Sequence, residues 1–413
     1  MKSTLLWTAC AVLMMTGTSC EGLNPGRDRE NAYQPMTLTT RSAEFIEKGN
    51  TFSFDLLERV NAVTEEDYII SPLSLQFLLG MILDGARNET AAEICQVLGY
   101  GSGEMDAVHA HNLSLLEQLP GLDKQTTLNI ANAIFVDDGW PLLDSYKAEV
   151  GKYYQATVSN LDFSQGAYSL KVINGWCSKQ TAGMIPKVLD EVSEDMLAYL
   201  LNALYFKSQW RAKFPKSATA DQRFTTESGA AAEVKMMRQV HDYPYTETER
   251  FQAVRLPYGN GAFSMVVLLP KAGAEAADIA ADLHQNGAGF LRSDMYTCEV
   301  DLWLPKFETK FKIKLNDLLS EMGMPHSFDG VQADFKAMSD YALCLSFVQQ
   351  DAIIKVDEEG TEAAAVSSAG MMKATAVGPE RRVVFHADHP FLYLITESAT
   401  GAVLFAGRYG GGQ

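Results

Sequence analysis

The segment Asn202-Ala-Leu-Tyr-Phe-Lys-Ser-Gln-Trp210 closes a long apolar run that begins at Met196. The run is rich in aromatic and aliphatic side chains and contains neither Gly nor Pro. A run of this kind predicts a buried β-strand over residues 196–206. A second run, Asn129-Ile-Ala-Asn-Ala-Ile-Phe-Val136, predicts another buried strand earlier in the chain.

Strand patterns continue toward the C-terminus. We expect strands at residues 263–269 and 300–304, and two more within residues 383–409 on either side of the turn-like segment Thr396–Gly401. No linker separates these runs, so one domain is expected over residues 40–413.

Helical patterns occupy the N-terminal half. Ser71 is a good N-cap and Pro72 suits the first helical turn. The residues that follow share one predicted helical face: Leu75, Leu78, Leu79, Ile82 and Leu83. Other helices are expected near residues 52–57, 90–98 and 111–119. Helices first and strands later favour an α+β domain built on large sheets.

One segment matches no core element. From Glu358 to Arg382 the chain has 25 residues without an aromatic residue, Leu or Ile. Segments of this length without regular structure are uncommon in compact domains and are often functional. We expect an exposed loop here; taken alone, its Glu/Thr/Ala composition also suits a short helix or a linker.

Several motifs occur in a fixed order along the chain. The main ones are Asn202–Trp210 with Phe214, Val234-Lys-Met-Met-Arg-Gln239, Glu358-Glu-Gly-Thr-Glu-Ala-Ala-Ala365, Phe385-His-Ala-Asp-His-Pro-Phe-Leu-Tyr-Leu-Ile395 and Leu404-Phe-Ala-Gly-Arg408. Lesser ones are Ser71–Ser74, Asn129–Asn132, Leu256–Tyr258 and Leu304–Phe307. This ordered set spans about residues 50–409 and resembles the serpin family. The chain departs from the family pattern at Ser208, where glycine is usual, and at Gln350, where many members carry histidine.

The resemblance implies a serpin fold, with helices packed around large β-sheets and a reactive-centre loop at about residues 358–382. It implies that the loop's hinge comprises Glu358, Glu359, Gly360, Thr361, Glu362, Ala363, Ala364 and Ala365. It also implies a scaffold that governs opening of the sheet, formed by Ser71, Ser74, Asn202, Trp210 and Gln350.

The function implied is protease inhibition by suicide-substrate trapping. A target serine protease, or a papain-like cysteine protease, cleaves the loop and forms an acyl-enzyme, and the loop then inserts into the main sheet. The expected partner is therefore a protease held in a covalent complex, with no cofactor or metal, and the protein is expected to be a monomer. The alternative is a non-inhibitory serpin that serves as a binding or carrier module.

The composition of the loop suits insertion. Alternate residues of a strand face opposite sides, so one face would carry only small uncharged residues: Thr361, Ala363, Ala365, Ser367 and Ala369. Glu362 would lie on the other face and stay in solvent. No proline occurs from Glu358 to Gly378, so every backbone N–H is available to pair.

Counting along the hinge as in the serpin family, the resemblance implies a scissile bond near Ala374–Thr375. Counting back from the C-terminal motif places it nearer Val377, and Met372 and Lys373 are neighbouring alternatives. A small residue such as Ala374 suits elastase-like or subtilisin-like pockets, whereas Lys373 would suit a trypsin-like pocket.

Charge and motifs exclude other classes. The formal net charge is −18 with no basic block, which disfavours nucleic-acid binding and contact with anionic membrane surfaces. The chain has no Gly-x-Ser-x-Gly elbow, His-Glu-x-x-His pair or phosphate-binding loop, so we do not expect an enzyme.

The N-terminus has the pattern of an export signal. Lys2 precedes a short apolar run, and small residues lead to Cys20. We expect residues 1–20 to be a signal, Cys20 to be a lipidation site, and residues 21–39 to be a tether. The protein would then be a lipoprotein of the outer membrane or cell surface, or else be extracellular. The four remaining cysteines are expected to be buried free thiols.

Overall fold

The computed structural model describes residues 31–292, 295–361 and 382–412. The chain divides into two units, Met1–Ala32 and Tyr33–Gln413, and every element named below belongs to the second. Its α-helices are α2 (Ser42–Val63), α3 (Pro72–Gly85), α4 (Asn88–Leu98), α5 (Met105–Gln118), α6 (Asp144–Tyr153), α7 (Gly166–Gln180), α8 (Ala276–Asn286) and α9 (Asn316–Met322). Short 3-10 helices are η1 (Leu119–Gly121), η2 (Lys216–Ala218), η3 (Gly289–Leu291) and η4 (Pro325–Phe328).

Two large sheets form the centre of this unit. The larger runs in the order β1 (Tyr68–Ile70), β15 (Val403–Tyr409), β14 (Phe391–Glu397), β8 (Phe263–Pro270), β7 (Phe251–Pro257), β6 (Ala231–Glu247), β9 (Tyr296–Pro305) and β13 (Arg382–His386), with β5 (Ala220–Thr225) beside β6. The second runs in the order β10 (Phe307–Lys314), β11 (Gln349–Val356), β12 (Gly360–Thr361), β4 (Ala198–Gln209), β2 (Thr127–Asp137) and β3 (Thr157–Leu161). Pairing is antiparallel except between β13 and β9 and between β2 and β3. The predicted α+β architecture is confirmed.

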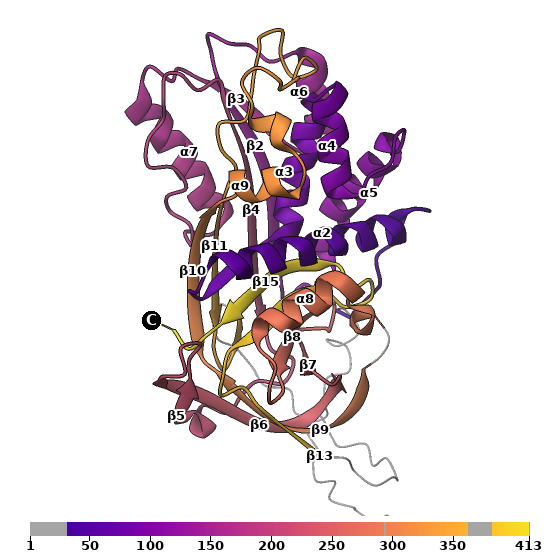
Figure 1. Ribbon diagram of the computed structural model, residues 1–413, viewed down its shortest axis with the longest axis vertical. Helices are drawn as coiled ribbons and strands as arrows, with labels where there is room; N and C mark the ends of the chain where they lie inside the picture. Colours follow the sequence, from indigo (N-terminus) through magenta and orange to yellow (C-terminus); the bar gives the residue numbers. More distant parts are fainter. Residues whose placement is uncertain (1–30, 293–294, 362–381, 413) are drawn as a thin grey trace, which may run out of the picture. The chain divides into compact units, whose positions relative to one another are not determined.

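Helix α3 lies at the centre of the packing. Ser71 caps it by accepting a hydrogen bond from the Ser74 backbone N–H, and Pro72 occupies its first turn. It packs against β4 and β15, and α7 packs on β2 and β4 (Figure 1). The five residues of the predicted helical face are all buried, and neighbouring helices and strands bury almost every other residue of this helix as well.

The predicted strands are present, most of them with longer bounds, and β4 begins two residues after the predicted start at Met196. The apolar runs that begin at Met196 and Asn129 became β4 and β2, which pair along their length with Asn202 opposite Asn132. The longest strand, β6, was not predicted, because its charged and polar residues hide the apolar alternation. Among the described residues, no helix is both long and apolar enough to span a membrane.

The folded unit begins earlier than the predicted end of the tether at residue 39. Met36 is buried in the main core, and the Gln118 side chain exchanges two hydrogen bonds with the backbone of Thr37. Residues 33–39 thus pack with the body.

The cysteines differ in exposure. Cys95, Cys177, Cys298 and Cys344 are free thiols, as expected. Cys177 and Cys298 are buried, and burial raises the pKa of the Cys177 thiol to about 12. The expectation that all four are buried was wrong, since Cys344 is exposed and Cys95 is partly so.

Candidate functional site

The two residues of β12 lie between β11 and β4. Thr361 is opposite Val356 on one side and Ser208 on the other, in antiparallel register, and Gly360 is opposite Gln209. Within residues 31–292, 295–361 and 382–412, the sheet passes from β11 to β4 only through β12. The start of the predicted loop is therefore already a central strand at one end of this sheet.

Glycine is required at position 360 by close approach. A Cβ atom built there would lie 2.1 Å from the Ser208 carbonyl oxygen and 2.6 Å from the Gln209 Cα atom. Both are backbone atoms that cannot turn aside, so any larger residue would push β12 away from β4.

Thr361 faces the core. Its side chain is 2% exposed, and its hydroxyl shares a 2.6 Å hydrogen bond with the hydroxyl of Tyr258. Burial raises the pKa of Tyr258 well above its usual value, so the phenol is neutral. Tyr258 stacks on Trp210 with ring centroids 4.5 Å apart.

Trp210 holds the segment that precedes β12. Its indole N–H donates to the Asp357 carbonyl oxygen at 2.8 Å, and its backbone N–H donates to the Glu359 carbonyl oxygen at 2.9 Å. Trp210, which was predicted to belong to the sheet-opening scaffold, therefore contacts the backbone of the predicted hinge.

The two hinge glutamates are bound by lysines. The buried Glu358 accepts from Lys306 at 2.8 Å and from the Thr219 hydroxyl at 3.0 Å. Burial acts to raise the pKa of Glu358, but these hydrogen bonds outweigh it and the pKa is lowered. Glu359 accepts from Lys213 at 2.7 Å, which with Lys216 lowers the pKa of Glu359.

A polar cluster lies further along the same sheet. The Gln350 side chain accepts from the Ser71 backbone N–H and donates to the Ser71 carbonyl oxygen, both at 2.8 Å. The Ser74 hydroxyl donates to Asn202, whose amide donates in turn to Asn132 at 2.6 Å. The structure thus brings together four of the five predicted scaffold residues. Gln350, which stands where many serpins carry histidine, has both of its polar atoms bonded.

Three cavities lie between β4 and β11. A cavity of about 20 Å³ lies beside Thr361, Leu204 and Ile354. A second, of about 40 Å³, lies at Asn202 and Gln350. A third, of about 420 Å³, lies between residues 196–201 and residues 341–349. We call this line of three cavities the seam.

Sequence reasoning missed three residues that hold the hinge. Tyr258, Lys306 and Lys213 contact Thr361, Glu358 and Glu359. Tyr258 and Lys306 lie in the short motifs Leu256–Tyr258 and Leu304–Phe307, which were noted without a role. No pattern indicated Lys213, because a lone lysine after a strand is common.

Several predicted site residues lie outside the described residues. They are Cys20, the hinge residues Glu362, Ala363, Ala364 and Ala365, and the candidate cleavage positions Met372, Lys373, Ala374, Thr375 and Val377.

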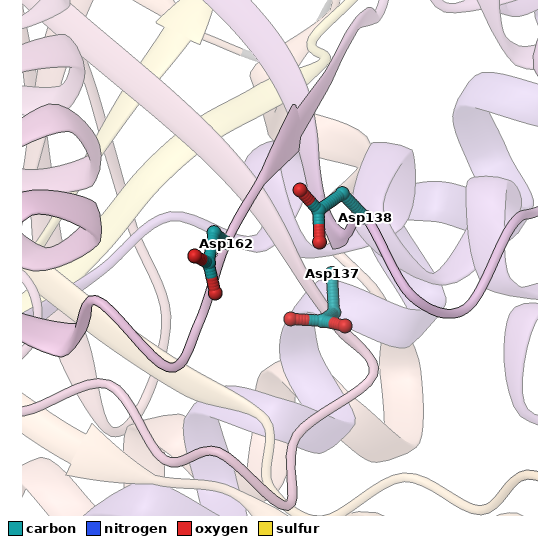
Figure 2. Close-up of side chains that lie close together, drawn as sticks. All are labelled: Asp137, Asp138 and Asp162. Carbon is teal, nitrogen blue, oxygen red and sulfur yellow. The ribbon is translucent and has the colours of Figure 1, made fainter.

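Three carboxylates gather at the ends of β2 and β3, where no site was predicted. Asp137, Asp138 and Asp162 offer oxygen atoms within 4.8 Å of one another (Figure 2). Asp137 accepts backbone N–H groups of Gly139 and Phe163, and Asp162 accepts from Ser164 and Gln165, which lowers its pKa. These carboxylates therefore stabilise turns, and we assign no metal to them.

Comparison with known proteins identifies the family. The profile of the family described as serpin (serine protease inhibitor) matches residues 47–410. Serpin B6 of Macaca fascicularis is 34% identical over 371 residues, covering 88% of this chain and 98% of the relative. The leukocyte elastase inhibitor of Xenopus tropicalis is 33% identical over 372 residues, covering 87% and 97%. The solved structure of the thermophilic serpin Tengpin in its native state is 27% identical with a TM-score of 0.81, covering 93% of this chain and 98% of that one.

The chain belongs to the serpin family, which is described as a family of serine protease inhibitors and not of enzymes.

Proposed function

We propose that this chain is an inhibitory serpin that traps its target protease by inserting its cleaved loop along the seam. The observation that carries the proposal is the position of β12 between β11 and β4. Insertion of a serpin loop is a known case of strand addition to a sheet, and here the first two residues of such a strand are in register.

Extended beyond Thr361, this register would set each later loop residue opposite a known position of β4 and β11. Continued from Thr361 without a bulge, Ala363 falls opposite Phe206 and Ile354, both buried. Ala365 falls opposite Leu204 and Ala352. Small residues therefore meet the bulky positions of the seam, which supports insertion with few clashes.

Polar loop residues also meet polar partners in this register. Ser367 falls opposite Asn202 and Gln350, within the polar cluster. Glu362 falls on the opposite face of the sheet between Lys207 and Lys355. Opposite charges on directly facing strand positions attract, so this match favours the same register.

The trapping step requires one covalent exchange. The nucleophile of the protease attacks the carbonyl carbon of Ala374, the Ala374–Thr375 bond breaks, and Thr375 leaves as an amine that takes up the nucleophile's proton. The acyl bond then links the protease to Ala374. Insertion from Thr361 to Ala374 would move the protease about 40 Å, at about 3.3 Å per residue.

Elastase-like and subtilisin-like proteases are the proposed targets, with trypsin-like enzymes through Lys373 and papain-like enzymes as alternatives. The name of the leukocyte elastase inhibitor supports the first preference. We also propose export as a bacterial lipoprotein anchored at Cys20. Mass spectrometry of the N-terminal peptide from the native host would detect the acyl chains.

Incubation with elastase, subtilisin, trypsin and papain tests the proposal. An inhibitor gives a complex that survives denaturing gels at the summed mass of both proteins. A carrier module gives only cleaved chain or no reaction with all four. Mass spectrometry of the released C-terminal fragment identifies the scissile bond.

A further inference from the structure

Helix α5 carries two buried histidines that the proposed function does not use. His109 and His111 are only 3% and 4% exposed. An α-helix turns by about 100° per residue, so side chains two positions apart lie on opposite sides of it. His109 accordingly contacts α3 and α6, whereas His111 contacts α2. Groups of the kind that titrates near neutral pH thus hold this one helix on two sides.

His109 has a carboxylate as its partner. Its Nε2 lies 2.8 Å from Oδ1 of Asp84, and its ring stacks on Tyr153 with centroids 4.1 Å apart. Burial raises the pKa of Asp84, and the hydrogen bond with His109 acts in the opposite direction. A protonated ring at position 109 would therefore keep a charged partner. The other charged groups around this pair are Arg87, Asp106, Glu149 and Lys152.

His111 has a hydroxyl in place of a carboxylate. Its Nδ1 lies 3.2 Å from the hydroxyl of Ser42, which is also hydrogen-bonded to Thr39. Its ring packs on Phe45 with centroids 5.5 Å apart. Within residues 31–292, 295–361 and 382–412, no carboxylate bonds this ring. Burial lowers the pKa of His111 to about 4, so the ring is neutral at pH 7.

The charged groups around Phe45 are bound to one another. Two cations lie over the Phe45 ring, 4.9 and 5.2 Å from its centroid, and both bind the same two carboxylates. These four residues are Arg41, Lys48, Glu44 and Glu104. Each carboxylate therefore already has two cationic partners. A proton on His111 in the folded unit would place an unpaired charge between α2 and α5, which is costly.

We propose that α5 is an acid-released latch, in which protonation of His111 separates α5 from α2 while the rest of the unit stays folded. This inference goes beyond the proposed function, because it involves neither a protease nor loop insertion. Opening of α5 would expose His111 to water, where its pKa returns to about 6.5. The open state would then bind a proton more readily than the closed state, so the stability of the closed latch is complete above pH 6.5 and is lost as the pH falls toward 4.

Hydrogen exchange of the full chain, read by mass spectrometry at pH 7, 6 and 5, tests the latch. The measured quantity is the opening equilibrium constant of α5 peptides, corrected for the intrinsic exchange rate at each pH. The buried strand β14 serves as an internal reference. His111→Gln keeps a donor toward Ser42, and His111→Phe keeps a ring against Phe45, but neither side chain titrates. His241→Gln is the control, because it removes an exposed histidine.

From pH 7 to pH 5, opening of α5 should rise about 20-fold in the unaltered chain and in His241→Gln. It should change by less than about twofold in His111→Gln and His111→Phe. An equal rise in the His111 variants would mean that another group releases α5, and a flat profile in the unaltered chain would mean that there is no latch. Either result overturns the proposal. A parallel rise in β14 also overturns it, because His111 would then act on unfolding of the whole unit.

Discussion

Tyr258 and Thr361 share a 2.6 Å hydrogen bond in the core, directly beneath the point where β12 lies between β11 and β4. Tyr258 is wholly buried and its ring rests on Trp210, which also holds the backbone of residues 357 and 359. The first residue of the loop to face inward is thus already bonded to the core.

Thr361→Arg should convert the protein from an inhibitor into a substrate. The guanidinium would replace a buried hydroxyl against a neutral phenol, and an unpaired buried charge costs several kcal/mol. Insertion would stall while cleavage continued. Gel assays with the target protease should show cleaved chain in place of complex, whereas Thr361→Ser should still form complex. Equal amounts of complex from Thr361→Arg and the unaltered chain would contradict insertion from this residue.

Tyr258→Phe should weaken the hinge without blocking it. The change leaves the Thr361 hydroxyl buried without its partner, at a cost of about 1–3 kcal/mol in the free energy of unfolding. Chemical denaturation of the intact protein measures the difference, with Tyr341→Phe as a control at an exposed position. The prediction fails if both variants unfold alike.

The ion pair of Glu358 with Lys306 should make stability depend on pH. The folded pKa of Glu358 is lowered, so its carboxylate stabilises the folded state above the unfolded pKa of about 4.3. This contribution is lost as the pH falls through the folded value. Glu358→Gln should therefore lower the free energy of unfolding by about 1–3 kcal/mol at pH 7.

Denaturation of both proteins from pH 7 down to pH 3 checks this dependence. The difference in free energy of unfolding between Glu358→Gln and the unaltered chain should become smaller below about pH 4. Glu359→Gln is the matched control, and its more exposed carboxylate should matter less. If the difference in free energy of unfolding between Glu358→Gln and the unaltered chain does not change with pH, the loss of stability comes from the changed shape of the side chain and not from the lost charge.

Gln350→Ala should loosen the polar cluster. It would leave the backbone N–H of Ser71 without its side-chain partner, which we expect to cost about 1–3 kcal/mol, whereas the Ser71 carbonyl oxygen would keep its bond from the Leu75 backbone N–H. Gln349→Ala removes the neighbouring amide, which bonds Val188 and Asp351 instead. A larger fall in melting temperature for Gln350→Ala than for Gln349→Ala is the expected result, and the reverse order would count against the cluster as the more important contact.

The predictable parts of the fold were those with local signals. Ser71 and Pro72 indicated the start of α3, and uninterrupted apolar runs indicated β2 and β4. The strand β6 was not predicted. Its exposed face carries many charged residues, and a sequence with so many charged residues resembles a loop.

The residues of the candidate site could be predicted only where they lie in recognisable sequence motifs. The polar cluster joins Ser71 to Gln350 and Ser74 to Asn202, contacts between distant parts of the chain that only the resemblance implied. The seam and its largest cavity could not be predicted, because they depend on how two strands are spaced rather than on any one segment.

Glu362 should lie between Lys207 and Lys355 once the loop has inserted, and charge reversal tests this register. Glu362→Lys would place three like charges across neighbouring strands, at a cost of about 1–2 kcal/mol, and should reduce the gain in melting temperature on cleavage by about 2 °C. Replacing both lysines by glutamate in the Glu362→Lys background should restore the gain. The effect should shrink at high salt, because exposed charges are screened. If cleavage at low salt raises the melting temperature of Glu362→Lys as much as that of the unaltered chain, the loop does not continue the register that β12 begins.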